Sequence, residues 1–248
     1  MEKQYKAVFF DLGGTLRIAF LEEAYMRHAR RKMAEIAGTD MPYEEFYQMI
    51  EERYEPYRKW ALGEFKESGD EELWCKWLLP DFDPAHIRPI CHELSYQYRQ
   101  SKGYRVIVDG GLEVLHTLHD WGYKLGIISN IISTTFVPRL LEDYGIAEKM
   151  SCVILSSVAG IRKPDPEIFR LGAKGCGVTC AEMAYVGDTL SRDVLGRNAK
   201  VGLCIQIRNP SIAHRDTAFQ NTGLAPDVQI DDLAEIPELI RSKNSSQP

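Results

Sequence analysis

The second half of the chain alternates short apolar segments with stretches that carry helical periodicity. The apolar segments "YKLGIIS", "SCVIL", "MAYVG" and "VGLCIQI" each fit a buried strand, and helices are expected over residues 111–121, 137–144, 166–174 and 191–199. Strands that alternate with helices form parallel β-α-β units, whose sheet is covered on both faces. "DVQI" and "LAEIPELI" close the fold, and the polar tail "RSKNSSQP" is expected to fray. The chain is therefore predicted to be an α/β protein with a doubly wound parallel sheet.

A helical block interrupts this pattern after a first strand at Ala7–Phe10. Residues 17–104 show almost no strand signal, and apolar residues recur there at helical spacing. Gly38 is placed to end the first helix of the block, and Asp70 and Asp83 are placed to begin later helices. We therefore predict a core domain made of residues 1–16 and 105–248 and an all-helical domain made of residues 17–104.

Charge and cysteine usage argue against several classes of function. The 248 residues carry a net charge of −6, and no segment gathers Lys and Arg into a basic cluster, so binding to nucleic acid is not expected. No apolar stretch approaches the length of a membrane span and no secretory signal is recognisable, so no membrane association is expected. The six cysteines include no Cys-x-x-Cys pair and are expected to be reduced thiols in the cytoplasm. The sequence leaves the oligomeric state open.

Polar side chains follow several of the predicted strands. They are Asp11 after the first strand, Ser129 and Asn130 after "KLGII", Lys163 in the loop after the third strand, and Asp188 and Asp193 after "MAYV". In a parallel α/β sheet, ligands bind at the carboxyl ends of the strands. Three carboxylates, a hydroxyl group and a lysine are therefore expected to converge at one edge of the sheet.

The segment "VFFDLGGTLR" allows two interpretations. Asp-x-Gly-Gly-Thr resembles the first phosphate loop of sugar kinases with the actin-like ATPase fold. It also resembles the first motif of the haloacid dehalogenase superfamily, Asp-x-Asp-x-Thr, with Gly13 in place of the second Asp. In the kinase fold a β-hairpin continues after the loop, whereas residues 18–37 carry a helical period, and that fold gives no reason for the later motifs.

The chain resembles the haloacid dehalogenase superfamily over nearly its whole length. "FFDLGGTL" is similar to the first motif of that superfamily, "GIISN" to the second, "AGIRKPDPEIF" to the third and "YVGDTLSRDV" to the fourth. The helical block is similar to the α-helical cap of the subclass that includes small-molecule phosphatases. The resemblance implies a Rossmann-like core with a helical cap inserted after the first strand.

The resemblance also implies a role for each strand-end residue. Asp11 would be the nucleophile that forms an aspartyl-phosphate, and Mg²⁺ would be bound by Asp11, Asp188 and the backbone carbonyl of Gly13. Lys163 and Ser129 would bind phosphate oxygens, with help from backbone N–H groups near Asn130. Asp193 would bind either a metal-bound water or Lys163.

Gly13 departs from the pattern of the family phosphatases. There, the Asp at this position protonates the leaving oxygen and later deprotonates the attacking water, and glycine can do neither. General acid–base help contributes roughly 10²–10⁴-fold to the rate. We therefore predict a cytoplasmic Mg²⁺-dependent hydrolase that acts on a small phosphorylated metabolite or a phosphonate. It would keep the nucleophile, the metal ligands and the phosphate contacts, but lack the aspartate that donates and accepts the proton.

Three alternatives follow from the same glycine. Phosphonoacetaldehyde hydrolases of the superfamily place a small residue here and cleave a C–P bond after a cap lysine forms an imine. The candidate lysines are Lys32, Lys59, Lys66 and Lys76, for each of which a surface role is expected. Dehalogenases place Tyr here and need no metal, which the retained Asp188 and Asp193 argue against. The third alternative is a catalytically impaired relative that binds a phosphorylated ligand or a partner protein without turnover.

Overall fold

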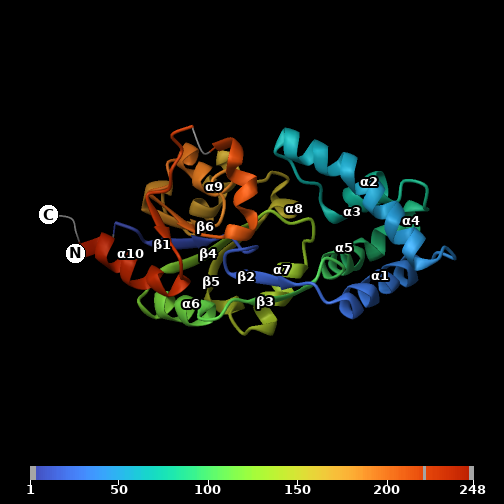
Figure 1. Ribbon diagram of the computed structural model, residues 1–248, viewed down its shortest axis with the longest axis horizontal. Coiled ribbons are helices and arrows are strands. Elements are labelled where there is room, and N and C mark those ends of the chain that lie inside the picture. The colour runs from blue at the N-terminus through green and yellow to red at the C-terminus, as the bar shows by residue number, and fades with distance from the viewer. Residues whose placement is uncertain (1–3, 220–221, 246–248) are drawn as a thin grey trace.

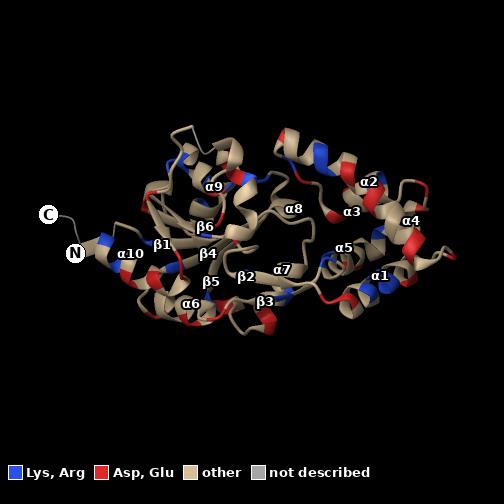
Figure 2. Ribbon diagram, viewed as in Figure 1, with Lys and Arg blue, Asp and Glu red and all other residues tan. Residues whose placement is uncertain are grey.

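The computed structural model describes residues 4–219 and 222–245 and consists of two lobes. One lobe is an α/β domain built on a six-stranded sheet, and the other is a bundle of helices, with a two-stranded ribbon running between them (Figure 1). Lys and Arg are interspersed with Asp and Glu along both lobes (Figure 2). Within the described residues, none of the helices combines the length and apolar character needed to cross a membrane.

The sheet has the strand order β5-β4-β1-β6-β7-β8, and every neighbouring pair is parallel. Its strands are β1 (Ala7–Phe10), β4 (Lys124–Ser129), β5 (Met150–Leu155), β6 (Met183–Gly187), β7 (Leu203–Ile207) and β8 (Val228–Ile230). The order runs outward from β1 in both directions, which is the arrangement of a doubly wound fold. The predicted α/β class and all six predicted strands are confirmed.

Helices cover both faces of the sheet. They are α6 (Gly111–Asp120), α7 (Phe136–Asp143), α8 (Ser156–Ala159), α9 (Pro166–Gly175) and α10 (Ile236–Ser245), with 3₁₀ helices at Ala147–Lys149, Cys180–Glu182, Val194–Ala199, Pro210–Phe219 and Leu233–Glu235. Val8 and Phe10 belong to one hydrophobic cluster, whereas Ala7 and Phe9 belong to another on the opposite face. Both faces of β1 are therefore buried, which is why the strand is apolar throughout.

The helical lobe has a core of its own, rich in aromatic side chains. Its elements are α1 (Glu23–Ala37), α2 (Tyr43–Glu64), α3 (Asp70–Glu72), a π-helix (Leu73–Leu78), α4 (Pro84–Ile87), a 3₁₀ turn (Arg88–Ile90) and α5 (Cys91–Gln100). Phe46, Tyr57 and Trp74 are fully buried in one cluster. Gly38 ends α1 in the left-handed region with φ 64°, and the side chain of Asp83 accepts a hydrogen bond from the Ala85 N–H, so both predicted helix ends are confirmed.

The ribbon between the lobes corrects the prediction that residues from Ile18 onward are helical. Strand β2 (Arg17–Phe20) pairs antiparallel with β3 (Tyr104–Ile107), and α1 begins only at Glu23. The partner of β2 lies beyond the whole helical lobe in sequence, so local periodicity cannot reveal the pairing. The predicted domain boundaries at residues 16–17 and 104–105 fall at this ribbon and stay a prediction.

Three smaller expectations were wrong. Asp70 does not cap a helix: it lies inside α3, where its buried carboxylate accepts hydrogen bonds from Thr134 of the α/β lobe. The predicted helix over residues 191–199 is a 3₁₀ helix over Val194–Ala199, and Gly196 within it lowers helix propensity. The tail does not fray at residue 241, because α10 continues to Ser245, and residues 246–248 lie outside the described part.

Candidate active site

The predicted site residues meet at the carboxyl edge of three neighbouring strands. Asp11 follows β1 at the centre, Ser129 is the last residue of β4 on one side, and Asp188 follows β6 on the other side. The Asp11 N–H donates a hydrogen bond to the carbonyl of Val186 in β6, so the pairing of the two strands continues to Asp11. All three residues line one pocket of about 240 Å³.

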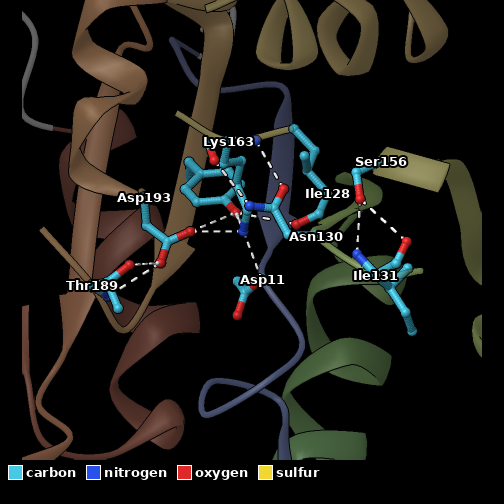
Figure 3. Close-up of polar contacts among 9 residues, drawn as sticks. Asp11, Ile128, Asn130, Ile131, Ser156, Lys163, Thr189 and Asp193 are labelled. Atoms are coloured by element: carbon cyan, nitrogen blue, oxygen red, sulfur yellow. Dashed lines mark hydrogen bonds and ion pairs between the residues drawn. The ribbon is translucent and has the colours of Figure 1, made fainter. Parts of the chain in front are cut away.

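Lys163 lies at the centre of the polar contacts. Its Nζ atom is 2.6 Å from Asp11 Oδ1, 2.8 Å from Asp193 Oδ1 and 2.7 Å from the hydroxyl group of Tyr185. Figure 3 shows the ammonium group between the two carboxylates. Burial alone would lower the pKa of Lys163, but the charges of Asp11 and Asp193 outweigh this effect and raise it. The lysine is therefore held as a buried cation next to Asp11.

Asp193 is fully engaged with other protein groups. Its Oδ2 atom accepts hydrogen bonds from the N–H and the hydroxyl group of Thr189, and its Oδ1 atom contacts Lys163 and the hydroxyl group of Tyr185. The charge of Lys163 lowers the pKa of Asp193, although burial opposes this shift. Of the two roles expected for Asp193, these contacts favour the positioning of Lys163. Tyr185 and Thr189 were missed from the sequence, because a tyrosine inside a buried strand gives no local sign of a polar contact.

Asn130 and Ser129 make different contributions. The side chain of Asn130 pairs with the backbone of Lys163, accepting from its N–H at 2.8 Å and donating to its carbonyl at 2.9 Å (Figure 3). Only its backbone is thus left for the expected contact with phosphate. The hydroxyl group of Ser129 has no hydrogen-bond partner among the described residues and lines the pocket.

A cluster of carboxylates gives the site a donor set for a metal ion. Asp11, Asp188 and Asp193 each place an oxygen within 4.8 Å of the others. Burial and the charges of Asp11 and Asp193 raise the pKa of Asp188 to about 8. Burial also raises the pKa of Asp11, and the charge of Lys163 opposes this shift. Lys163 is the ion-pair partner of Asp11 and Asp193 among the described residues, and no ion pair is formed there by Asp188. A cluster of hard carboxylate oxygens of this kind suits a divalent cation such as Mg²⁺.

The two glycines after Asp11 differ in what they allow. A Cβ atom placed on Gly13 would have no heavy atom within 4 Å, so the missing side chain leaves open space. Gly14 has φ 91°, and a Cβ atom there would lie 1.9 Å from Asp188 Oδ2. Glycine is therefore required at position 14 by the backbone and by Asp188, whereas nothing in the fold requires it at position 13.

Buried contacts hold the helical lobe against the α/β lobe beside the site. Glu67 accepts a hydrogen bond from Ser156 Oγ at 2.9 Å and pairs with Arg162 at 3.2 Å, and Asp70 contacts Thr134. The four candidate lysines of the cap, Lys32, Lys59, Lys66 and Lys76, are all exposed, and none of them lines the pocket that contains Asp11. The surface role expected for these lysines therefore fits the structure.

Comparison with known proteins agrees with this geometry. A family model described as haloacid dehalogenase-like hydrolase matches residues 5–199. The glyceraldehyde 3-phosphate phosphatase of Methanopyrus kandleri is 29% identical over 242 residues, which cover 95% of this chain and 97% of that protein. The glyceraldehyde 3-phosphate phosphatase of Methanothermobacter thermautotrophicus is 31% identical over 241 residues, covering 95% and 99%.

The fold is shared with a solved structure. The crystal structure of 2-haloacid dehalogenase from Pseudomonas syringae has a TM-score of 0.65 and 19% identity, and the match covers 96% of this chain and 99% of that one. The family match over residues 5–199 spans all four motifs of the sequence and the helical lobe. The chain belongs to the haloacid dehalogenase-like hydrolases.

Proposed function

We propose that the protein is a Mg²⁺-dependent phosphatase of small phosphorylated metabolites that works through an aspartyl-phosphate on Asp11. The observation that carries the proposal is the contact of Lys163 with both Asp11 and Asp193 in a pocket that Asp188 also lines. The relatives named glyceraldehyde 3-phosphate phosphatase make that compound the first substrate to test.

The side chains divide the reaction between them. Asp11 attacks phosphorus in line and the leaving oxygen departs, after which water cleaves the aspartyl-phosphate and releases inorganic phosphate. Lys163 and the free hydroxyl group of Ser129 bind non-bridging phosphate oxygens and stabilise the charge that develops there. Asp193 and Tyr185 keep the ammonium group of Lys163 in place through the contacts described above.

The carboxylate cluster is the proposed metal site. Asp11, Asp188 and the backbone carbonyl of Gly13 would hold Mg²⁺, which supplies charge neutralisation for the transferring phosphoryl group when bound. Asp193 is occupied by Lys163 and Thr189, which supports its exclusion from the ligand set.

Gly13 supports a second candidate function, the binding of a phosphorylated ligand without turnover. The open space at this position holds no acid that can protonate a leaving oxygen. The imine route to C–P cleavage lacks support from the four cap lysines, since each is exposed and outside the pocket. Turnover of phosphate esters with good leaving groups separates the two remaining candidates.

The test is phosphate release from a metabolite panel that includes glyceraldehyde 3-phosphate and an aryl phosphate. Each compound is assayed with Mg²⁺ and with a chelator, and Asp11→Asn serves as the matched variant without a nucleophile. We expect release that requires both Mg²⁺ and Asp11. Release that persists in Asp11→Asn would refute the mechanism, and tight binding of inorganic phosphate without any turnover would support the binding function instead.

A further inference from the structure

The pocket that contains Asp11 is also lined by four arginine side chains from four segments of the chain. They are Arg17 in β2, Arg99 in the last turn of α5, Arg192 in the loop after β6 and Arg215 in the 3₁₀ helix near the end of the core. The mechanism proposed above uses none of them. Their sequence spacing gives no sign that they converge.

The charges that line the pocket do not balance. Five cationic side chains, the four arginines and Lys163, stand against three carboxylates, which leaves a surplus of two positive charges. A divalent cation held by the carboxylates would enlarge this surplus. With that cation bound the surplus is four, and the two negative charges of a phosphoryl dianion compensate only half of it.

Arg17 and Arg99 are the pair that most clearly lacks a partner. Neither guanidinium group forms an ion pair or a side-chain hydrogen bond with a described residue, and Arg17 Nη1 and Arg99 Nε are buried without any acceptor. Arg17 is 4% exposed, and its guanidinium group lies over the ring of Phe136, at 4.9 Å from the ring centroid. Burial and the nearby charge of Arg99 lower the pKa of Arg17 to about 9. Buried cations are ordinarily paired.

Other arginines at the same boundary between the lobes do have partners. Arg162 pairs with the carboxylate of Glu67, and Arg105 donates to the backbone carbonyls of Arg99 and Gly103. Arg162 Nε is also buried without an acceptor, but its Nη1 atom is paired with Glu67, whereas Arg17 and Arg99 have no side-chain hydrogen bond or ion pair at all among the described residues. A planar guanidinium group matches the two oxygens of a carboxylate or phosphate, so the acceptor missing from the protein is one that a ligand can bring.

We propose that Arg17 and Arg99 bind a second anionic group of the substrate, so that the substrate is a short phosphorylated acid or a bisphosphate rather than a neutral phosphate ester. This inference rests on the proposed phosphatase function and names its substrate class. The volume of about 240 Å³ lies below the usual range of pockets for larger ligands, so the two anionic groups are separated by only a few atoms. The phosphoryl group lies at Asp11 and Lys163, and the second anion lies toward the helical lobe.

A pair of matched substrates tests the proposal. Glyceraldehyde 3-phosphate carries an aldehyde where 3-phosphoglycerate carries a carboxylate, and the two compounds are otherwise the same. A bisphosphate of similar length then shows whether the pocket prefers a second phosphate or a carboxylate. We expect kcat/KM to be roughly 10- to 100-fold higher for a doubly anionic compound, the factor that a charge-assisted hydrogen bond supplies. In Arg17→Met and Arg99→Met the ratio of kcat/KM for 3-phosphoglycerate to kcat/KM for glyceraldehyde 3-phosphate should fall toward one. The main cause should be a higher KM for the doubly anionic substrate.

The ratio does not depend on how much of a variant is folded, because both substrates are measured on the same preparation. Arg58→Met is the control, since Arg58 is an exposed arginine of the helical lobe and should keep the wild-type ratio. A preference for the aldehyde in the wild type, or a ratio that Arg17→Met and Arg99→Met leave unchanged, would overturn the proposal while leaving the phosphatase function intact.

Binding measured without turnover tests the proposed anion site independently of the proposed phosphatase activity. Phosphonoacetate and methylphosphonate share a phosphonate and differ by a carboxylate, and calorimetry on Asp11→Asn gives their affinities in the absence of chemistry. Phosphonoacetate should bind about 10- to 100-fold more tightly, and Arg99→Met in the same background should remove the difference. Equal affinities would overturn the proposal even if no tested phosphate ester is hydrolysed.

Discussion

Replacing Gly13 with aspartate adds a carboxyl group at a position where the structure has room for one. No heavy atom lies within 4 Å of a Cβ atom placed there, and Gly13 is not among the residues with positive φ. An L-residue therefore fits without backbone strain. The neighbouring Gly14 tolerates no such change, because its Cβ atom would overlap the carboxylate of Asp188. Gly13→Asp should thus supply the missing proton donor without disturbing the fold.

The expected gain follows from the basicity of the leaving group. General acid–base catalysis contributes roughly 10²–10⁴-fold, which equals about 3–5 kcal/mol of transition-state stabilisation. Alkyl phosphates should gain most, because their leaving oxygen is strongly basic, and aryl phosphates should gain little. The wild type also lacks a base for the second step, so aspartyl-phosphate should accumulate and give a burst of leaving group before slow turnover. Gly13→Asp should abolish that burst.

The assay compares glycerol phosphate with para-nitrophenyl phosphate in the wild type, in Gly13→Asp and in Gly13→Asn. Asparagine matches the shape of aspartate but cannot transfer the proton, so it separates chemistry from packing. Rapid-mixing measurements record the burst, and circular-dichroism melts confirm that each variant folds. If folded Gly13→Asp is no faster than Gly13→Asn, and the wild type cleaves both compounds at similar rates, another group supplies the proton and the reasoning is wrong.

Three further predictions concern the metal, the contact between the lobes and the cap lysines. Asp188→Ala should weaken Mg²⁺ binding more than about tenfold in calorimetry, and an unchanged affinity would rule out the proposed ligand set. Glu67→Ala leaves the buried charge of Arg162 unpaired, so the free energy of unfolding in urea should fall by about 3–5 kcal/mol. Glu67→Gln should lower the free energy of unfolding by less, because the amide oxygen can still accept the hydrogen bond from Ser156. Equal losses in the two variants would contradict this account. Phosphonoacetaldehyde with borohydride should label none of the four cap lysines stoichiometrically, because all are exposed and outside the pocket; a stoichiometric adduct in mass spectrometry would restore the imine route.

The strands that carry the site are predictable because each is buried on both faces. Phe9 and Phe10 point into different hydrophobic clusters, so β1 is apolar at every position. The first polar residue after such a run marks the carboxyl end of the strand. Asp11 and Asp188 can be located in this way, and the parallel sheet then brings them together.

The features that the sequence does not reveal are decided by contacts across the fold. Asp70 has the local signature of a helix cap, but its Oδ2 atom accepts hydrogen bonds from Thr134 of the other lobe. Strand β2 pairs with a segment on the far side of the helical lobe in sequence. Arg99 has the same local pattern as a solvated arginine on a helix, and only the assembled pocket shows that its Nε has no acceptor.

The positions of Arg17 and Arg99 link substrate choice to the connection between the lobes. Arg17 is the first residue of β2, and Arg99 lies in the last turn of α5, shortly before β3. Each therefore lies on or next to one of the two chain segments that join the helical lobe to the core. Arg17 is buried and Arg99 is half-buried, and the two cations repel each other. Burial and this repulsion together lower the pKa of Arg17. An anion bound by both would remove this repulsion and stabilise the positions of the two side chains in the pocket. We thus expect phosphoryl transfer to depend on residues at the strand ends of the core, and discrimination among phosphorylated compounds to depend on the residues where the second lobe is attached.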